Sequence, residues 1–118
     1  MPDEPRICDL RAALSRMGGD LGILRKLVEF FREDVPPMLS QLRSAVDAGD
    51  ADGVLHAAHG LRGLVCNFDA QAAVLAAQRL EHKAADCNLA GAGGAVLELE
   101  RELARLSETL ASELATMK

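Results

Sequence analysis

The stretch LGILRKLVEFFREDVPPMLSQLRSA, residues 21–45, carries the clearest fold signal in the chain. Its apolar side chains recur three or four positions apart, at Leu21, Leu24, Val28, Phe31, Val35, Met38, Leu42 and Ala45. Because an α-helix has about 3.6 residues per turn, this spacing places them on one helix face. Pro36 and Pro37 interrupt the run, but the apolar register continues across them, which predicts one kinked helix and not two separate helices.

The segment before residue 21 is expected to hold a short additional helix. Its apolar residues have the same spacing, at Ile7, Leu10, Leu14 and Met17. Gly18 and Gly19 end this helix, and Asp20 is a suitable N-cap for the long helix. Residues 1–6, with two prolines among polar side chains, are expected to form a loose leader.

Three further helices are expected downstream of the long one. The third helix starts at Asp50 or Asp52 and runs to about Phe68, and Asp69 can cap the fourth. A loop over residues 86–94, rich in glycine, then leads to the last helix, whose apolar residues are Val96, Leu99, Leu103, Leu106, Leu110, Leu114 and Met117. The pattern predicts an all-α fold: an antiparallel up-and-down four-helix bundle with a short extra N-terminal helix.

Length and composition agree with a single domain over residues 1–118. The chain is 49% hydrophobic and 26% charged, which is typical of a globular protein. It lacks Trp and Tyr and is dominated by Leu and Ala, side chains that lose little freedom in a helix. No second apolar face is evident, so we expect a monomer.

Charge and cysteine content exclude several classes of protein. The net charge of -5 argues against binding to nucleic acid. Cys8, Cys66 and Cys87 are odd in number and form no CxxC pair, which argues against a disulfide framework or zinc knuckle and fits a reducing cytoplasm. The longest uncharged stretch, residues 87–97, is shorter than the roughly 20 residues of a membrane span, and no secretory signal is visible. We therefore expect a cytoplasmic protein that binds neither membranes nor nucleic acid.

The stretch HAAHGLRGLVCNFDA, residues 56–70, is the candidate functional segment. On a helical projection the buried stripe of this helix comprises Val54, Ala58, Leu61, Val65 and Phe68. His59 lies roughly 140° from the centre of that stripe, so its ring should be exposed to solvent. Arg62 lies one turn further on, with its Cβ roughly 5–6 Å from that of His59, and Gly63 lies beside it.

This arrangement suits phosphoryl transfer. An exposed imidazole with an ordinary pKa near 6.5 is largely neutral in the cytoplasm and can act as a nucleophile. A fixed cation such as Arg62 can hold a phosphoryl group, and the missing side chain at Gly63 leaves room for it. Phosphoryl transfer depends mostly on positioning and charge stabilisation. On spacing alone, however, an ordinary solvated helix face explains such a pattern more often than a site does.

The runs AAHGLRG (57–63), NFDA (67–70) and LAAQRLE (75–81) resemble the histidine-containing phosphotransfer (HPt) domain of bacterial phosphorelays. The matching positions are Ala58, His59, Leu61, Gly63, Asn67, Phe68, Ala70, Leu80 and Glu81. The upstream segment, residues 18–59, looks like the second helix and linker of the family, and the resemblance extends from about Leu10 to Leu114.

The resemblance implies a helical bundle in which His59 accepts a phosphoryl group from a receiver-domain aspartate and passes it on. The partner would be the receiver domain of a response regulator or of a hybrid histidine kinase. Such a protein needs no cofactor of its own, because the Mg²⁺ required for transfer belongs to the receiver. We expect no independent enzymatic turnover, and no ATP binding because the sequence has no Gly-rich nucleotide loop.

The sequence departs from the family pattern at three places. Arg62 replaces the usual lysine, which keeps the charge but presents a broader fork of donors. Asp69 replaces the usual glycine before Ala70, and we interpret it as a helix cap that could also tune specificity. Leu64 and Val65 replace the small residues common after the glycine. None of these changes removes the nucleophile.

Other readings of the same residues remain open. Gln78 and His82 are expected near the level of His59 on the next helix, where they could steady its imidazole or the phosphate, although two solvated side chains are the simpler interpretation. His56 and His59 could form a two-histidine metal clip, but no third ligand has suitable spacing. A docking module that binds a receiver without accepting phosphate is a further alternative, and the chain could be one domain of a hybrid kinase.

Overall fold

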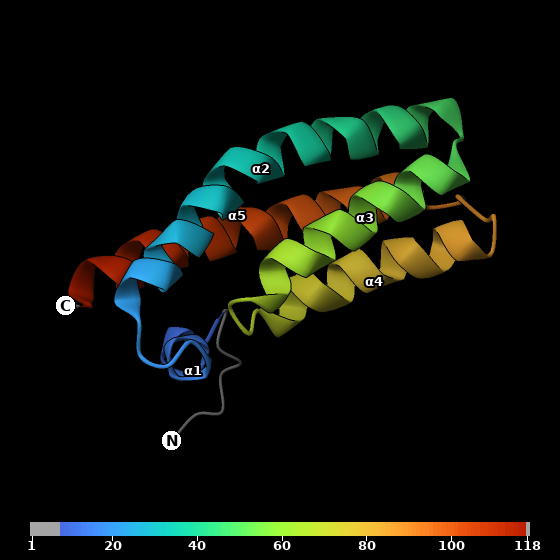
Figure 1. The fold of residues 1–118 in the computed structure, drawn as a ribbon. Helices are drawn as coiled ribbons and strands as arrows, with labels where there is room; N and C mark the ends of the chain where they lie inside the picture. The colour runs from blue at the N-terminus through green and yellow to red at the C-terminus, as the bar shows by residue number, and fades with distance from the viewer. Residues whose placement is uncertain (1–7, 118) are drawn as a thin grey trace, which may run out of the picture.

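The computed structural model describes residues 8–117, and over that range it contains five helices and no strand (Figure 1). The helices are α1 (Leu10–Arg16), α2 (Leu21–Ala48), α3 (Ala51–Cys66), α4 (Gln71–Ala85) and α5 (Ala92–Thr116). The all-α prediction is therefore confirmed for the described residues. Ile7 and the loose leader predicted for residues 1–6 lie outside them.

The longest helix, α2, continues without a break through Pro36 and Pro37, as the apolar register predicted. Both prolines are exposed, so their rings do not disturb the interior. The apolar face of α2 is buried at Leu24, Val28, Phe31, Val35, Leu42 and Ala45, while Leu21 and Met38 are half-buried. Burial of this one face keeps the helix in line across a point where its backbone hydrogen bonding is interrupted.

Aspartate side chains begin the first three helices. Asp9, Asp20 and Asp50 accept hydrogen bonds from the backbone N–H groups of the third residue after each, at 3.0, 3.2 and 3.0 Å. Each bond satisfies an N–H that has no partner inside the helix. The N-cap roles predicted for Asp20 and Asp50 are confirmed, and Gly49 ends α2 in the left-handed region with φ 66°.

The interpretation of Asp69 as the cap of the fourth helix is wrong. The N-cap of α4 is Ala70, which makes no side-chain cap hydrogen bond. Asp69 instead has a φ of 53°, in the left-handed region, and its carboxylate accepts a 2.8 Å hydrogen bond from the Arg16 guanidinium. The residue therefore shapes the turn between α3 and α4 and links that turn to α1.

Two predicted boundaries also move. The third helix ends at Cys66, two residues before the predicted end at Phe68. The loop predicted for residues 86–94 is shorter, because α5 begins at Ala92 and includes Gly93 and Gly94 in its first turn.

The four longer helices share one apolar core. α3 packs against α2 and α4, α4 packs against α5, and α2 packs against α5, while α1 lies across one end (Figure 1). The Phe31 and Phe68 rings meet edge to face with centroids 5.8 Å apart. Every residue of the stripe predicted for α3 is buried: Val54, Ala58, Leu61, Val65 and Phe68. The opposite face of α3 is therefore turned outward.

None of the helices described is long and apolar enough to span a membrane.

Candidate functional site

His59 lies on the outward face of α3, and its side chain is 68% exposed. The neighbouring residues Ala58 and Leu61 are fully buried. A helix that buries one face must present the residues opposite to solvent. The predicted exposure of the His59 ring is confirmed, and its surface is open to an approaching partner.

Glu81 on α4 is the partner that holds the His59 ring. Its Oε2 atom lies 3.2 Å from His59 Nδ1. The Glu81 side chain is only 14% exposed, so the surrounding protein covers most of it. Glu81 matches a position of the family motif, but no role at the site was predicted for it from the sequence.

Arg62 completes a cluster with these two residues. Its Nε donates to Glu81 Oε1, and its Nη2 donates to Glu81 Oε2 at 3.3 Å and lies 3.1 Å from His59 Nδ1. Hydrogen bonding to Glu81, reinforced by the attraction between the two charges, raises the pKa of the Arg62 guanidinium above its ordinary value. The guanidinium is therefore a permanent cation, fixed beside the ring by two contacts with one carboxylate. We call His59, Arg62 and Glu81 the His59 cluster.

The other ring nitrogen of His59 is open. Within residues 8–117, Nε2 has no hydrogen-bond partner, whereas Nδ1 has both Glu81 and Arg62 within 3.2 Å. The cluster thus fixes one side of the ring and leaves the other to solvent.

The two glycines on either side of Leu61 and Arg62, Gly60 and Gly63, differ in their surroundings. A Cβ on Gly63 would meet no atom within 4 Å, so there is open space at this position, and its use by a phosphoryl group stays a prediction. A Cβ on Gly60 would instead overlap with the terminal methyl group of Met38 on α2. Gly63 leaves open space at the helix surface, and Gly60 leaves room for the end of the Met38 side chain from α2.

Gln78 and His82 are not brought to the ring. In the described part of the chain, neither side chain forms a hydrogen bond with His59; Gln78 is half-buried and His82 is exposed on α4. Their support of the imidazole or of the phosphate stays a prediction. The register of α4 on α3 gives the contact to Glu81, one residue before His82.

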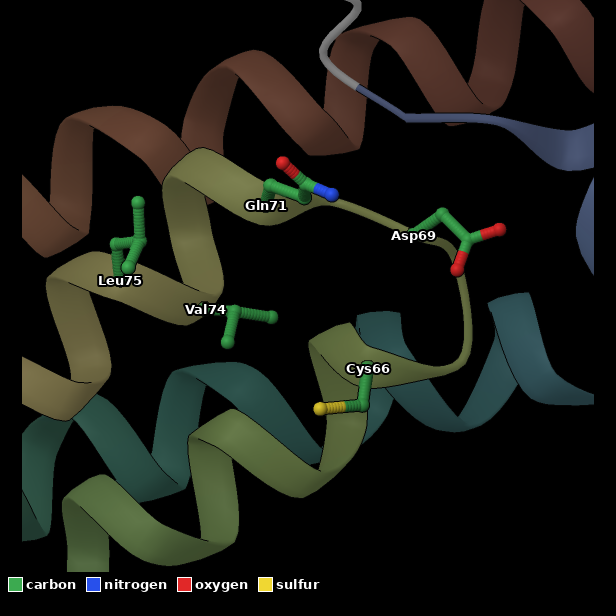
Figure 2. Close-up of a pocket in the computed structure, with 5 residues that line it drawn as sticks. All are labelled: Cys66, Asp69, Gln71, Val74 and Leu75. Atoms are coloured by element: carbon green, nitrogen blue, oxygen red, sulfur yellow. The ribbon is translucent and has the colours of Figure 1, made fainter.

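Two depressions flank the His59 cluster along α3. One, with a volume of about 360 Å³, is lined by Asp52, Leu55, His56 and His59 itself. The other, of about 310 Å³, lies near the turn between α3 and α4, two turns beyond His59. Figure 2 shows it between Cys66 on α3 and Val74 and Leu75 on α4, with Asp69 and Gln71 at the connecting turn.

A metal site has no support in this geometry. Across residues 8–117, no three His, Cys, Asp or Glu side chains come together as ligands for one ion. The predicted clip of His56 and His59 is therefore left with two nitrogen ligands, fewer than the three protein ligands usual for zinc.

Comparison with known proteins agrees with this picture. The family model of the Hpt domain matches residues 26–109. The crystal structure of histidine-containing phosphotransfer protein B (HptB) from Pseudomonas aeruginosa PAO1 is similar, with 25% sequence identity and a TM-score of 0.86, over 98% of this chain and 100% of that one. A search of curated proteins finds no match. Because the family model covers most of the sequence, this chain belongs to the Hpt domain family of phosphorelay proteins.

Proposed function

We propose that this protein is a phosphorelay intermediate in which His59 accepts a phosphoryl group from a receiver-domain aspartate and passes it to another receiver. The observation that carries the proposal is the state of the His59 ring: it is 68% exposed, held at Nδ1 and open at Nε2. A nucleophile in a transfer protein must be reachable by the donor and fixed in direction, and this ring meets both requirements.

In the proposed reaction the Nε2 lone pair attacks the phosphorus of the aspartyl phosphate. The Nε2–P bond forms as the bond between phosphorus and the aspartate oxygen breaks, and the carboxylate leaves with its electron pair. The ring keeps its proton on Nδ1 and gains positive charge, which the Glu81 carboxylate at 3.2 Å stabilises. The reverse sequence delivers the group to the next aspartate.

Arg62 and Gly63 have supporting roles in this proposal. The Nη1 group of Arg62 has no hydrogen-bond partner among the described residues, so it is available to a phosphoryl oxygen while Nε and Nη2 hold Glu81. Gly63 leaves space for that group. The Mg²⁺ used in transfer would belong to the receiver, and this chain would act as a carrier without a cofactor, ATP binding or turnover of its own.

We also propose the finer architecture that the sequence predicted. The helices α2–α5 would form an antiparallel up-and-down four-helix bundle with α1 added at one end, and residues 1–118 would form one domain. Support comes from the contacts of α2 with α3 and α5, of α3 with α4 and of α4 with α5. The connections between successive long helices are short, which favours antiparallel neighbours.

A cytoplasmic monomer is the setting that we propose for this activity. Cys8, Cys66 and Cys87 are all free, as expected in a reducing compartment. The large exposed apolar side chains of the described residues, Ile23, Phe30, Leu75 and Leu97, are distributed over three helices, as expected for a monomer. The net charge of -5 disfavours nucleic acid as a partner.

The test follows radioactive phosphate from a phosphorylated receiver domain onto this protein. We expect wild type to acquire label that is labile in acid and stable in base, as a phosphohistidine is. His59→Gln should abolish the labelling, and His56→Gln, which removes the exposed histidine one turn earlier, should retain it. Label that persists in His59→Gln would contradict the proposal, and receiver binding without any phosphohistidine would indicate the docking module instead.

A further inference from the structure

A groove lies between α2 and α5, the two long helices that contribute no residue to the His59 cluster (Figure 1). Its volume is about 250 Å³. Phe31, Val35 and Leu103 form its floor and are all buried. Along α2 the lining runs from Phe31 to Leu39, which spans roughly 12 Å, or about two helical turns. We call this depression the α2–α5 groove.

One charge in the lining of the α2–α5 groove is not compensated. Glu100 on α5 accepts hydrogen bonds from Arg43 on α2, so its charge is balanced. Arg32 is exposed, and within residues 8–117 its guanidinium forms no ion pair or hydrogen bond. A guanidinium binds a carboxylate through two parallel hydrogen bonds. The groove is therefore complementary to an apolar side chain that has a carboxylate close to it.

The rim of the groove provides a hydrogen-bond acceptor and space for a bound segment. Pro36 lines the groove and has no N–H, so the carbonyl of Arg32, four residues earlier, lacks its regular helical hydrogen bond. Such a carbonyl accepts a hydrogen bond from water or from a donor on a bound segment. On the α5 side the rim includes Ala104 and Ser107, whose short side chains allow a neighbouring backbone to come close.

The dimensions of the groove favour a helix of a partner protein over a small molecule. Pockets that enclose small ligands usually have volumes of about 300–1,000 Å³, and the α2–α5 groove lies below this range. An apolar groove between two helices, two turns long, suits the apolar face of a third helix whose anchoring side chains are three or four residues apart. The unpaired Arg32 adds the requirement for an acidic residue on that helix.

We propose that the α2–α5 groove is a docking site for an acidic amphipathic helix of a partner protein. One or two apolar side chains of that helix fill the groove, and an aspartate or glutamate one turn away pairs with Arg32. Because the groove and the His59 cluster belong to different pairs of helices, a helix bound in the groove leaves His59 accessible. This interaction goes beyond the proposed phosphoryl transfer and does not depend on it.

The experiment uses two synthetic peptides as probes. Both are about 16 residues long, so that they form a helix, and both carry leucines four residues apart among alanine and glutamine. One has glutamate one turn from each end of the leucine stripe, and its twin has glutamine there. Correlation spectra (¹H–¹⁵N) of the full ¹⁵N-labelled chain measure the affinity and locate the binding site. For the glutamate peptide we expect shifted amide signals at Val35, Leu39, Ala104 and Ser107.

The variants separate the charge of the groove from its shape. The glutamate peptide should bind wild type about tenfold more tightly than its twin, because only it pairs with Arg32. Arg32→Ala should remove this difference and leave the affinity of the glutamine peptide unchanged. Arg11→Ala is the matched control, since Arg11 is an exposed arginine on α1, outside the groove. Ala104→Leu fills the groove and should abolish binding of both peptides, with folding checked by circular dichroism.

Several results would overturn the proposal. These are no amide shifts at the groove with either peptide, equal affinities of the two peptides for wild type, or an equal loss for both peptides in Arg32→Ala. Dimerisation that Ala104→Leu abolishes would assign the groove to a second copy of the chain. Shifts caused by decanoate, with none caused by the peptides, would assign it to a small amphipathic carboxylate.

A last measurement tests whether the two surfaces are independent. A saturating concentration of the glutamate peptide should leave phosphoryl transfer from a receiver domain to His59 unchanged. Inhibition of that transfer would contradict separate surfaces. Failure of label to reach His59 without peptide would refute the proposed function, whereas the peptide affinities would still test the groove.

Discussion

The backbone of α3 at Gly60 lies so close to Met38 on α2 that a Cβ at residue 60 would overlap with the terminal methyl group of the methionine. Three residues later, Gly63 lies in open space. Both glycines reduce the intrinsic helix propensity of α3 by about 1 kcal/mol each relative to alanine. Their different surroundings distinguish a glycine whose added methyl group would displace the end of the Met38 side chain from one whose methyl group would meet nothing.

Gly63→Ala should raise the free energy of unfolding by about 1 kcal/mol, because the new methyl group meets nothing and the helix propensity improves. Gly60→Ala should gain less, since the Met38 methyl must move. Urea denaturation of both variants tests this order. Gly63→Ala should also accept phosphate more slowly, as its methyl narrows the space beside His59. A larger gain for Gly60→Ala would contradict the assignment.

Phe68→Ala should lower the free energy of unfolding by about 3–5 kcal/mol, because it removes a fully buried ring and its contact with Phe31. Phe30→Ala is the matched control. Phe30 precedes Phe31 in α2 but is 48% exposed, so its loss should have a small effect. Equal destabilisation by the two substitutions in urea would show that the core is not arranged as described.

Asp69→Ala should be less stable than Asp69→Gly by about 1–2 kcal/mol, because a Cβ is unfavourable at the φ of 53° found here. Both variants lose the ion pair with Arg16, so their difference isolates the backbone effect. Arg16→Ala removes that pair alone and should change stability only slightly, as expected for an exposed ion pair. Thermal unfolding of the three variants measures these differences. Equal stability of Asp69→Ala and Asp69→Gly would contradict the left-handed turn.

Cys8 should be the unreactive thiol of the three. Burial, with smaller contributions from Glu113 and Asp9, raises the pKa of the Cys8 thiol to about 11. Cys66 and Cys87 are exposed. A thiol reagent at neutral pH should modify these two in the folded protein, and Cys8 only after denaturation. Rapid modification of Cys8 in the native state would place it at the surface instead.

The raised pKa of Cys8 also predicts how stability changes in alkali. The unfolded thiol ionises from about pH 9 and the folded one near pH 11, so the folded state binds the proton more strongly. The resulting stabilisation is present below pH 9 and is lost as the pH rises toward 11. Denaturant titrations over this window should show a steeper loss for wild type than for Cys8→Ala. Parallel curves would contradict the shift.

The exposure of His59 was predictable because it depends on α3 alone. A helix of known period with five buried positions fixes the direction of every other residue. The start of α2 and of α3 was predictable for a similar reason, since Asp20 and Asp50 act on backbone groups within their own first turn.

The contact of His59 with Glu81 was not predictable in this way, because it depends on how α4 slides and rotates against α3. An error of one residue in that register predicts His82, and not Glu81, as the partner of His59. An error in the rotation of α4 about its axis predicts Gln78 in the same way.

Asp69 was misread for another reason. Aspartate is a common N-cap and also tolerates the left-handed region, and the sequence does not distinguish these two uses. The surroundings of Gly60 were not predictable either, because they depend on the position of the Met38 side chain on another helix, α2.

The two exposed prolines of α2 have a mechanical consequence. Their nitrogens carry no hydrogen, so the carbonyl groups of Arg32 and Glu33, four residues earlier, cannot receive the regular helical hydrogen bond. Val35 and Met38 keep the direction of the helix there by packing on the core. The centre of the longest helix therefore depends on side-chain packing, more than on its own backbone hydrogen bonds, to remain continuous.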